Sequence, residues 1–411
     1  MSEKMNIAAD SNNGGRKTPA RVLMAVPQYP YPVVGGLERQ SHELAKTLLA
    51  LGVAVQAVSG KIEPTQPAQD WVEGVLVHRI PWSHMKWLRF IRTPFDLLRV
   101  FFAIRNTYDV VHLHQHSSFG LFVILLARLL GKPVLTKLPN VGELGLPGMR
   151  ATRFGPLKLA IFKRSNAVVA MSSESLAELD VVGFPSGNVL ATPNGIRMRG
   201  DVVGVNSIRP EKVACRVVFV GRLIAQKMIE DLLHAWQQVS TNTARRVQLE
   251  LWGSGPLEAD LKQLCSALGL AESVVFRGHV DSVRDRLGEM DIFVLPSKAE
   301  GNSNAILEAM AAGLPVVSTR VGGTPMLVGA EGARFLIEPG DRAGLISRLL
   351  ELVEDIGLRQ RIGASMRQRV LDHFDIQRVA IAYAAAYDLL KVGEYERIGE
   401  LANPVITNAV I

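Results

Sequence analysis

The stretch from Asp291 to Gly323 reads DIFVLPSKAEGNSNAILEAMAAGLPVVSTRVGG, and it decides the fold. An apolar run at Asp291–Pro296 is typical of a buried strand, a loop of small and polar residues follows, and a helix is predicted at Ala305–Ala312. A second apolar strand is predicted at Pro315–Thr319. Two buried strands joined by a helix indicate a parallel sheet that is covered on both faces.

The same alternation extends outward in both directions from this stretch. Apolar runs bounded by turn residues predict further strands at Arg21–Val26, Val53–Val58, Asp109–Leu113, Val134–Thr136, Ala167–Met171, Arg216–Val220, Val247–Trp252 and Val274–Arg277. A polar stretch at 199–212 divides them into two sets. The sequence therefore predicts an α/β protein with two doubly wound, Rossmann-like domains that face a cleft.

Length and composition agree with two packed domains. The chain has 411 residues, 48% of them hydrophobic, which exceeds the size at which a single core keeps growing. Its two cysteines are too few for a disulfide scaffold or a four-thiolate zinc site, and they favour a reducing compartment. The most apolar segment, 119–131, is interrupted by Arg128 and is shorter than the roughly 20 residues that span a bilayer. With no signal-peptide pattern at the start, we expect a cytoplasmic protein.

The loop before the helix of the opening stretch is the first candidate for chemistry. It places Glu300 and Gly301 after a strand, and Glu308 lies one turn inside the helix. The first amides of that helix, Asn304–Ile306, are free to bind a phosphate at the carboxyl edge of the sheet. Two carboxylates beside a phosphate suit sugar hydroxyls, because an ionised carboxylate accepts several hydrogen bonds. The alternative is an ordinary helix whose dipole favours acids near its start.

Three further glycine loops follow predicted strands. Gly221 precedes two cations, Arg222 and Lys227, which could neutralise a diphosphate, and Gly253 makes a tight turn after the next strand. In the first half, Gly35-Gly36 opens a helix and lets a ligand approach the backbone amides. Each loop alone is also compatible with a solvated turn. None has the G-x-G-x-x-G spacing, so a nicotinamide cofactor is disfavoured.

Three histidines, His112, His114 and His116, alternate at the end of a predicted strand. Alternation would place them on one face, which raises the possibility of a metal site. No acidic or cysteine cluster lies nearby and the chain has no Asp-x-Asp motif, so metal binding is disfavoured. A single imidazole that hydrogen-bonds the substrate is the favoured interpretation.

The second half resembles the retaining glycosyltransferases of family 4, which have the two-domain GT-B fold. The E-x7-E signature of that family falls on Glu300 and Glu308, and the resemblance extends over residues 21–391. Together with composition it divides the chain into a disordered polar arm, an acceptor-side domain, a nucleotide-sugar-binding domain, a helix that crosses back to the first domain, and a tail. These segments are expected at 1–19, 20–200, 201–375, 376–391 and 392–411.

The resemblance implies a role for each motif residue. Glu300 would contact the donor sugar ring and Glu308 the ribose, while Arg222 and Lys227 would bind the diphosphate and stabilise the leaving nucleotide. Further donor contacts are implied for the glycine loops, the first amides of the helix and one apolar residue near the base: Gly35, Gly36, Gly221, Gly253, Val280, Gly301, Asn304, Ala305 and Ile306. Cations and a helix dipole would meet the leaving-group charge, so no metal is expected.

One departure from the family pattern affects the first domain. Many members carry Thr-x-His after the strand that corresponds to Val134–Thr136, and that histidine lies close to the transferred sugar. Here the chain has Lys137 in this region and no histidine. Lys137, His116 and Asn140 are therefore candidates for the sugar or acceptor side.

The resemblance implies transfer of a sugar from a UDP- or GDP-linked donor to a glycan or lipid-linked acceptor with retention of configuration, in surface polysaccharide or glycolipid synthesis. The nucleotide sugar is a co-substrate, no cofactor is expected, and no nucleic acid is an expected partner. Two alternatives remain: a sugar-nucleotide epimerase on the same fold, and a non-catalytic binding subunit.

Charge suggests one more partner. Residues 1–200 hold 23 Lys and Arg against 13 Asp and Glu, with basic clusters at 79–105 and 150–164. Within the first cluster, apolar residues recur at spacings of three and four, at Leu88, Ile91, Phe95, Leu98 and Phe102. Such an apolar stripe beside cations suits an anionic membrane surface. The alternative is that the stripe packs on the first-domain sheet. Pro94 is expected to start a new helix after Thr93.

Overall fold

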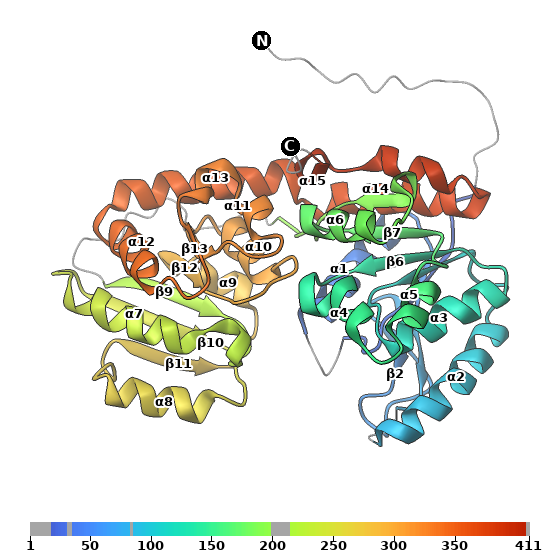
Figure 1. Ribbon diagram of the computed structural model, residues 1–411, viewed down its shortest axis with the longest axis horizontal. Coiled ribbons are helices and arrows are strands. Elements are labelled where there is room, and N and C mark those ends of the chain that lie inside the picture. Colours follow the sequence, from blue (N-terminus) through green and yellow to red (C-terminus); the bar gives the residue numbers. More distant parts are fainter. Residues whose placement is uncertain (1–17, 31–34, 83–84, 199–213, 408–411) are drawn as a thin grey trace, which may run out of the picture.

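The computed structural model describes residues 18–30, 35–82, 85–198 and 214–407, with residues 86–90 described as backbone only. Most of the predicted polar arm, the predicted linker at 199–212 and the last residues of the tail lie outside this description. The described chain forms two sheets with helices on both faces, side by side in Figure 1. The prediction of an α/β protein with two Rossmann-like domains is confirmed.

The first sheet has eight strands in the order β3-β4-β2-β1-β5-β6-β7-β8, and every neighbouring pair is parallel except β3 with β4. The strands are β1 Val22–Ala25, β2 Val55–Gly60, β3 Gln69–Val72, β4 Val75–Ile80, β5 Val110–Leu113, β6 Val134–Leu138, β7 Ala167–Ala170 and β8 Val189–Ala191. The β3–β4 hairpin was not predicted. Its turn contains Glu73 and Gly74, both with positive φ.

Two helical layers cover the first sheet. Along β1, Met24 faces a core closed by α1 (Gly36–Ala50) and α14 (Ile376–Val392), whereas Leu23 faces the opposite core. This alternation is the two-residue period of a strand that is buried on both faces. The opposite core is closed by α2 Lys86–Ala103, α3 Ser118–Leu129, α4 Leu146–Ala151, α5 Gly155–Phe162 and α6 Ser173–Val181. Short 3-10 turns occur at Gly142–Leu144 and Ser186–Asn188.

The second sheet has six parallel strands in the order β11-β10-β9-β12-β13-β14. The strands are β9 Cys215–Val220, β10 Val247–Trp252, β11 Val274–Gly278, β12 Ile292–Leu295, β13 Val316–Thr319 and β14 Leu336–Ile337. The helices are α7 Ile229–Thr241, α8 Glu258–Ala267, α9 Val283–Leu287, α10 Asn304–Ala311, α11 Thr324–Ala333, α12 Arg342–Glu354 and α13 Ile356–His373. A 3-10 turn, Ala225–Lys227, follows β9. The neighbours β12 and β9 are followed by the loops that contain Glu300 and Arg222.

The chain crosses between the sheets twice, and the crossings pair with each other. The Ile196 amide donates to the Phe374 carbonyl at 2.8 Å, and the Ile376 amide donates to the Ile196 carbonyl at 3.0 Å. Beyond this point α14 lies against the first sheet (Figure 1), where Tyr383 and Tyr387 are buried. The chain then continues through a 3-10 turn, Tyr395–Leu401, to α15, Pro404–Thr407.

Helix α2 corrects two expectations. It runs without interruption through Pro94, so the predicted new helix after Thr93 is wrong. The buried side chains of Leu97 and Phe101 hold the helix to the sheet and offset the hydrogen bond that a proline cannot donate. The apolar stripe does not pack on the sheet, because its members from residue 91 onward are exposed: Ile91, Phe95, Leu98 and Phe102. Neither α2 nor any other helix in the described ranges is long and apolar enough to cross a bilayer.

Candidate active site

The loop between β12 and α10, residues 297–303 (the Glu300 loop), lies against loops that follow β6 and β7. A Cβ atom added at Gly301 would lie 2.1 Å from the Pro139 carbonyl oxygen, so only glycine permits this approach. Asn302 Nδ2 donates to the Met171 carbonyl at 3.3 Å. Ligands of parallel α/β sheets bind beyond the carboxyl ends of the strands. This junction, which joins such ends from both sheets, is therefore the candidate active site.

Glu300 is held at the junction by two residues of the second half. Its Oε1 accepts hydrogen bonds from Lys227 Nζ and from Ser297 Oγ, each at 2.5 Å. The Glu300 and Lys227 side chains are only 9% and 16% exposed, so water screens their ion pair little. Two residues predicted from separate motifs are thus in direct contact.

Glu308, on α10, is shared by cations from both halves of the chain. Arg284 Nε, from α9, lies 3.2 Å from Glu308 Oε1. Arg39 Nη1, from α1, lies 3.5 Å from the same oxygen. The helix carboxylate therefore helps to fix the position of the second half against α1.

The first turn of α10 points at the first-half glycine loop. Asn304 Nδ2 donates to the Gly36 carbonyl at 2.8 Å. Ser303 caps the helix, and its Oγ accepts from the Ile306 amide at 3.5 Å. Because that distance is long for a hydrogen bond, the Ile306 amide is only weakly satisfied in this state. The helix start and Gly35-Gly36 are thus adjacent, as two sides of one site require.

The loops after β9 and β10 pack backbone against backbone. A Cβ atom added at Gly253, where φ is +139°, would lie 1.9 Å from the Gly221 carbonyl oxygen. The Gly221 amide donates to the Trp252 carbonyl at 2.9 Å. Arg222 follows and is exposed, and no ion pair to it is found among the described residues. Val280, after β11, is buried.

Glu38 on α1 lies close enough to Arg222 for their charges to interact across the junction. Burial raises the pKa of the Glu38 carboxyl, and the positive charge of Arg222 opposes that rise. Glu38, Arg39 and Arg284 were not predicted as site residues. A signal existed for the first two, because only Leu37 separates them from Gly35-Gly36 in the sequence. None existed for Arg284, whose contact with the site depends on how α9 packs.

The three histidines do not form one cluster. His112 and His114 are buried with ring centroids 4.0 Å apart, and His112 Nδ1 lies 2.7 Å from the Tyr387 hydroxyl. His116 lies beyond the end of β5, with Nε2 3.1 Å from the Leu144 carbonyl. Burial lowers the pKa of all three, so they are neutral near pH 7. Within the described ranges, no three His, Cys, Asp or Glu side chains are placed to share a metal ion.

Lys137 and Asn140 differ in where they lie. Lys137 is buried, and its Nζ donates to Asn194 Oδ1 at 2.7 Å. Burial lowers the pKa of Lys137 to about 7. Asn140 is half-buried, with its Cα 3.6 Å from the position of a Cβ atom added at Gly301. Asn140 therefore lies beside the Glu300 loop, whereas Lys137 is connected to that loop through Asn194.

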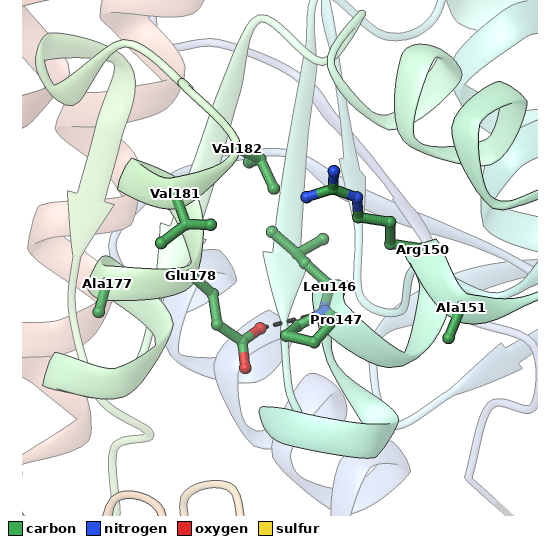
Figure 2. Close-up of a pocket in the computed structure, with 8 residues that line it drawn as sticks. All are labelled: Leu146, Pro147, Arg150, Ala151, Ala177, Glu178, Val181 and Val182. Atoms are coloured by element: carbon green, nitrogen blue, oxygen red, sulfur yellow. Dashed lines mark hydrogen bonds between the residues drawn. The ribbon is translucent and has the colours of Figure 1, made fainter.

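A separate cavity of about 430 Å³ lies between α4 and α6 (Figure 2). Leu146, Val181 and Val182 line it, and Arg150 and Glu178 are its charged residues. Glu178 accepts a hydrogen bond from the Leu146 amide at 2.9 Å, shown in Figure 2. The cavity belongs to the first half alone and does not contain any of the predicted donor-binding residues.

Two family models match the chain, one in each half. Residues 34–199 match the model described as Glycosyltransferase Family 4, and residues 214–355 match the model described as Glycosyl transferases group 1. Together they span about three quarters of the chain, and the Glu300 loop, Arg222 and Gly35-Gly36 all fall within them. The chain is a glycosyltransferase of the group 1 and family 4 type. The resemblance inferred from E-x7-E is confirmed.

Individual relatives and solved structures agree with this family. N-acetyl-alpha-D-glucosaminyl L-malate synthase of Bacillus anthracis is 23% identical over 88% of this chain and 96% of its own length. Lipopolysaccharide core biosynthesis glycosyltransferase LpsE of Rhizobium meliloti is 25% identical over 88% of this chain and 98% of its own. The structure of Anabaena HepE in complex with UDP-glucose matches with a TM-score of 0.70 and 19% identity, over 90% and 99% of the two chains. At that identity the structural match shows the fold, which is that of GT-B glycosyltransferases.

Proposed function

We propose that this glycosyltransferase moves a sugar from a UDP- or GDP-linked donor to its acceptor with retention of configuration, at the junction around Glu300. The observation that carries the proposal is the contact of Glu300 with Lys227 at 2.5 Å, beside the start of α10. Carboxylate, ammonium and helix amides together match a sugar diphosphate. The UDP-glucose bound to the Anabaena structure supports this donor class.

Each group has a distinct role in the proposed reaction. Arg222 and Lys227 bind the diphosphate, and the amides of Asn304, Ala305 and Ile306 face a phosphate. Glu300 binds hydroxyls of the sugar, with Gly301 allowing the close approach. The remaining donor contacts are those of Gly35, Gly36, Gly221, Gly253, Val280 and, to the ribose, Glu308.

The chemical step breaks the bond between the anomeric carbon and the diphosphate oxygen. The acceptor hydroxyl attacks on the same face, and its proton passes to the departing diphosphate. Charge that develops on the diphosphate is met by Arg222, Lys227 and the α10 dipole, which are already in place before the reaction. These positive groups supply the stabilisation that a metal ion would give, so we infer a metal-independent reaction.

The acceptor side is the first half, where Asn140, which lies beside the Glu300 loop, and His116 are the candidates. We infer a glycan or lipid-linked acceptor, in surface polysaccharide or glycolipid synthesis. The relative named for lipopolysaccharide core biosynthesis supports this class.

An exposed basic and apolar face of the first half supports a lipid-linked acceptor at the inner surface of the cell membrane. On α2, Phe95 is 70% exposed and Phe102 54% exposed, with Arg92 and Arg99 exposed on the same helix. The side chains of Lys86, Leu88 and Arg89, also part of the predicted stripe and cluster, lie outside the described residues. The first half also exposes the apolar side chains of Leu157, on α5, and of Phe154, just before that helix. Each cation near an anionic surface adds about 1 kcal/mol of binding.

Sedimentation with vesicles that contain acidic lipid tests the membrane contact. Arg92 and Arg99 changed together to Glu, or Phe95→Ser alone, should reduce binding several-fold. Ile381→Ser, on α14 at the other face, is the matched control because Ile381 is a similarly exposed apolar residue. Equal binding by all variants, or none by the wild type, removes the membrane from the proposal.

Release of nucleotide tests the transfer itself. The protein is incubated with labelled UDP- and GDP-sugars and a lipid or glycan extract, and free nucleoside diphosphate is measured. Release together with a labelled product supports transfer, an isomerised donor supports the epimerase alternative, and an unchanged donor supports a non-catalytic protein.

A further inference from the structure

A network of amide side chains crosses the junction beside Glu300. Asn194 lies in the loop after β8, shortly before the chain crosses to the second sheet at Ile196. Its Nδ2 donates to Asn304 Oδ1 at 2.9 Å and to the Asn302 carbonyl at 3.3 Å. Its backbone amide donates to Asn302 Oδ1 at 3.3 Å. Asn194, a residue of the first half, thus binds both Asn302 and Asn304, which follow Glu300 in the second half.

The other ends of the network also reach the first half. Asn304 Nδ2 donates to the Gly36 carbonyl, and Asn302 Nδ2 donates to the Met171 carbonyl. Asn194 and Asn302 are buried, so a lost hydrogen bond would not be replaced freely by water. The Glu300 loop is therefore attached to the loops after β7 and β8 and to the start of α1.

Lys137 fixes the orientation of the Asn194 amide. An ammonium group only donates, so the Asn194 oxygen must face Lys137 Nζ, 2.7 Å away. The amide nitrogen is then directed at Asn304 and Asn302, whose oxygens accept. No carboxylate among the described residues pairs with Lys137, so Asn194 is the partner that this buried cation has.

We propose that Asn194 and Lys137 are positioning residues for sugar transfer: Lys137 orients the Asn194 amide, and Asn194 holds the Glu300 loop against the first domain in the arrangement in which transfer occurs. The role of these residues in sugar transfer rests on the proposed function, whereas the hydrogen-bond network itself does not. Nucleotide binding should depend little on Asn194, because the groups assigned to the diphosphate belong to the second half. The sugar and the acceptor must be aligned across the junction, so turnover should depend on it strongly.

Three variants separate positioning from general stability. Asn194→Ala removes every side-chain contact of the network centre. Asn194→Asp keeps an acceptor for Lys137, so the buried cation is still paired and the fold should be preserved. The aspartate has no N–H to donate to Asn304 or Asn302. Asn403→Ala is the control. Asn403 lies in the same crossing region, where its side chain donates to the His373 carbonyl and its backbone amide to the Ala191 carbonyl, and no hydrogen bond joins it to the Glu300 loop among the described residues.

Hydrogen exchange of the amides at 299–304 is the first readout, and it does not depend on activity. We expect exchange to be about tenfold faster or more in Asn194→Ala and Asn194→Asp, from the loss of two hydrogen bonds, and unchanged in Asn403→Ala. Turnover should fall about tenfold or more in the first two, while the Kd for UDP or GDP stays within about twofold. Lys137→Met combined with Asn194→Ala should be no worse than Asn194→Ala alone, since Lys137 acts through Asn194.

Wild-type exchange in Asn194→Ala, or wild-type exchange and turnover in Asn194→Asp, would overturn the proposal. So would additive effects of the Lys137 and Asn194 changes. If the wild type transfers no sugar, the proposed function fails, and the exchange measurement still decides whether the network holds the loop.

Discussion

Replacing Arg222 by alanine should lower turnover by about 100- to 1,000-fold and leave the fold intact. Arg222 is exposed, and no described residue forms an ion pair with it, so its removal breaks no ion pair and loses only the charge interaction with the half-buried Glu38. Substitutions of this kind usually change stability by no more than about 0.5 kcal/mol. Lys227 is a less direct test, because its removal would leave the largely buried Glu300 without its cation.

The assay measures kcat and KM for the donor by nucleotide release, with circular dichroism and thermal unfolding on the same samples. Arg246→Ala is the matched control: Arg246 is an exposed arginine of the same sheet, but it precedes β10 and so lies at the edge opposite the site. Arg222→Lys should recover part of the activity, because it keeps the charge and loses the two-pronged hydrogen bonding. Wild-type kcat and KM in folded Arg222→Ala would refute the assignment of this residue to the leaving group.

Three further outcomes are expected. Transfer should persist in excess chelator, and complete loss that Mn²⁺ or Mg²⁺ restores would show that a metal is required. Truncation after Asp372 should destabilise the protein strongly, because it removes α14 with the buried Tyr383 and Tyr387; full stability in thermal unfolding would contradict this. In the unfolded chain Lys137 keeps its proton up to about pH 10.5, whereas its pKa in the fold is about 7. The free energy of unfolding should therefore rise between pH 7 and 10.5 by up to about 1.4 kcal/mol per unit relative to Lys137→Met, and parallel pH profiles would rule this out.

Much of the second sheet could be predicted because its strands are apolar on both faces. The runs at 216–220 and 291–296 leave few alternatives to buried parallel strands, and β9, β10, β11, β12 and β13 fall within or next to their predicted ranges, whereas the two-residue strand β14 was not predicted. The β3–β4 hairpin was harder to predict from the sequence. Its edge strand β3 has only four residues, and the first residue of its turn at positive φ is a glutamate, Glu73, where asparagine, aspartate or glycine is usual.

The candidate site was predictable where its residues lie on one loop or follow one strand. Glu300, Glu308 and Lys227 fall on short motifs whose spacing fixes their positions relative to the second sheet. The contacts of Glu308 with Arg39 and of Asn194 with Asn304 depend on how the two halves pack. No local pattern encodes that packing, so these partners needed the structure.

The surroundings of Lys137 also could not be predicted from the sequence. Its position in sequence suggested a group facing the substrate, but the alternation of β6 turns it toward the core that α14 closes. Leu135, two residues earlier on β6, packs in that core. A buried cation without a carboxylate partner is rare, and no sequence pattern around residue 137 predicts one.

The central claim is transfer of a sugar with retention of configuration, and the anomeric configuration of the product tests it most directly. The protein is incubated with an α-linked UDP- or GDP-sugar and an acceptor extract, and the new glycosidic bond is examined by proton NMR. The account predicts release of nucleoside diphosphate and an α-linked product, with both greatly reduced in Arg222→Ala. A β-linked product, or an isomerised donor with no transfer, would contradict it.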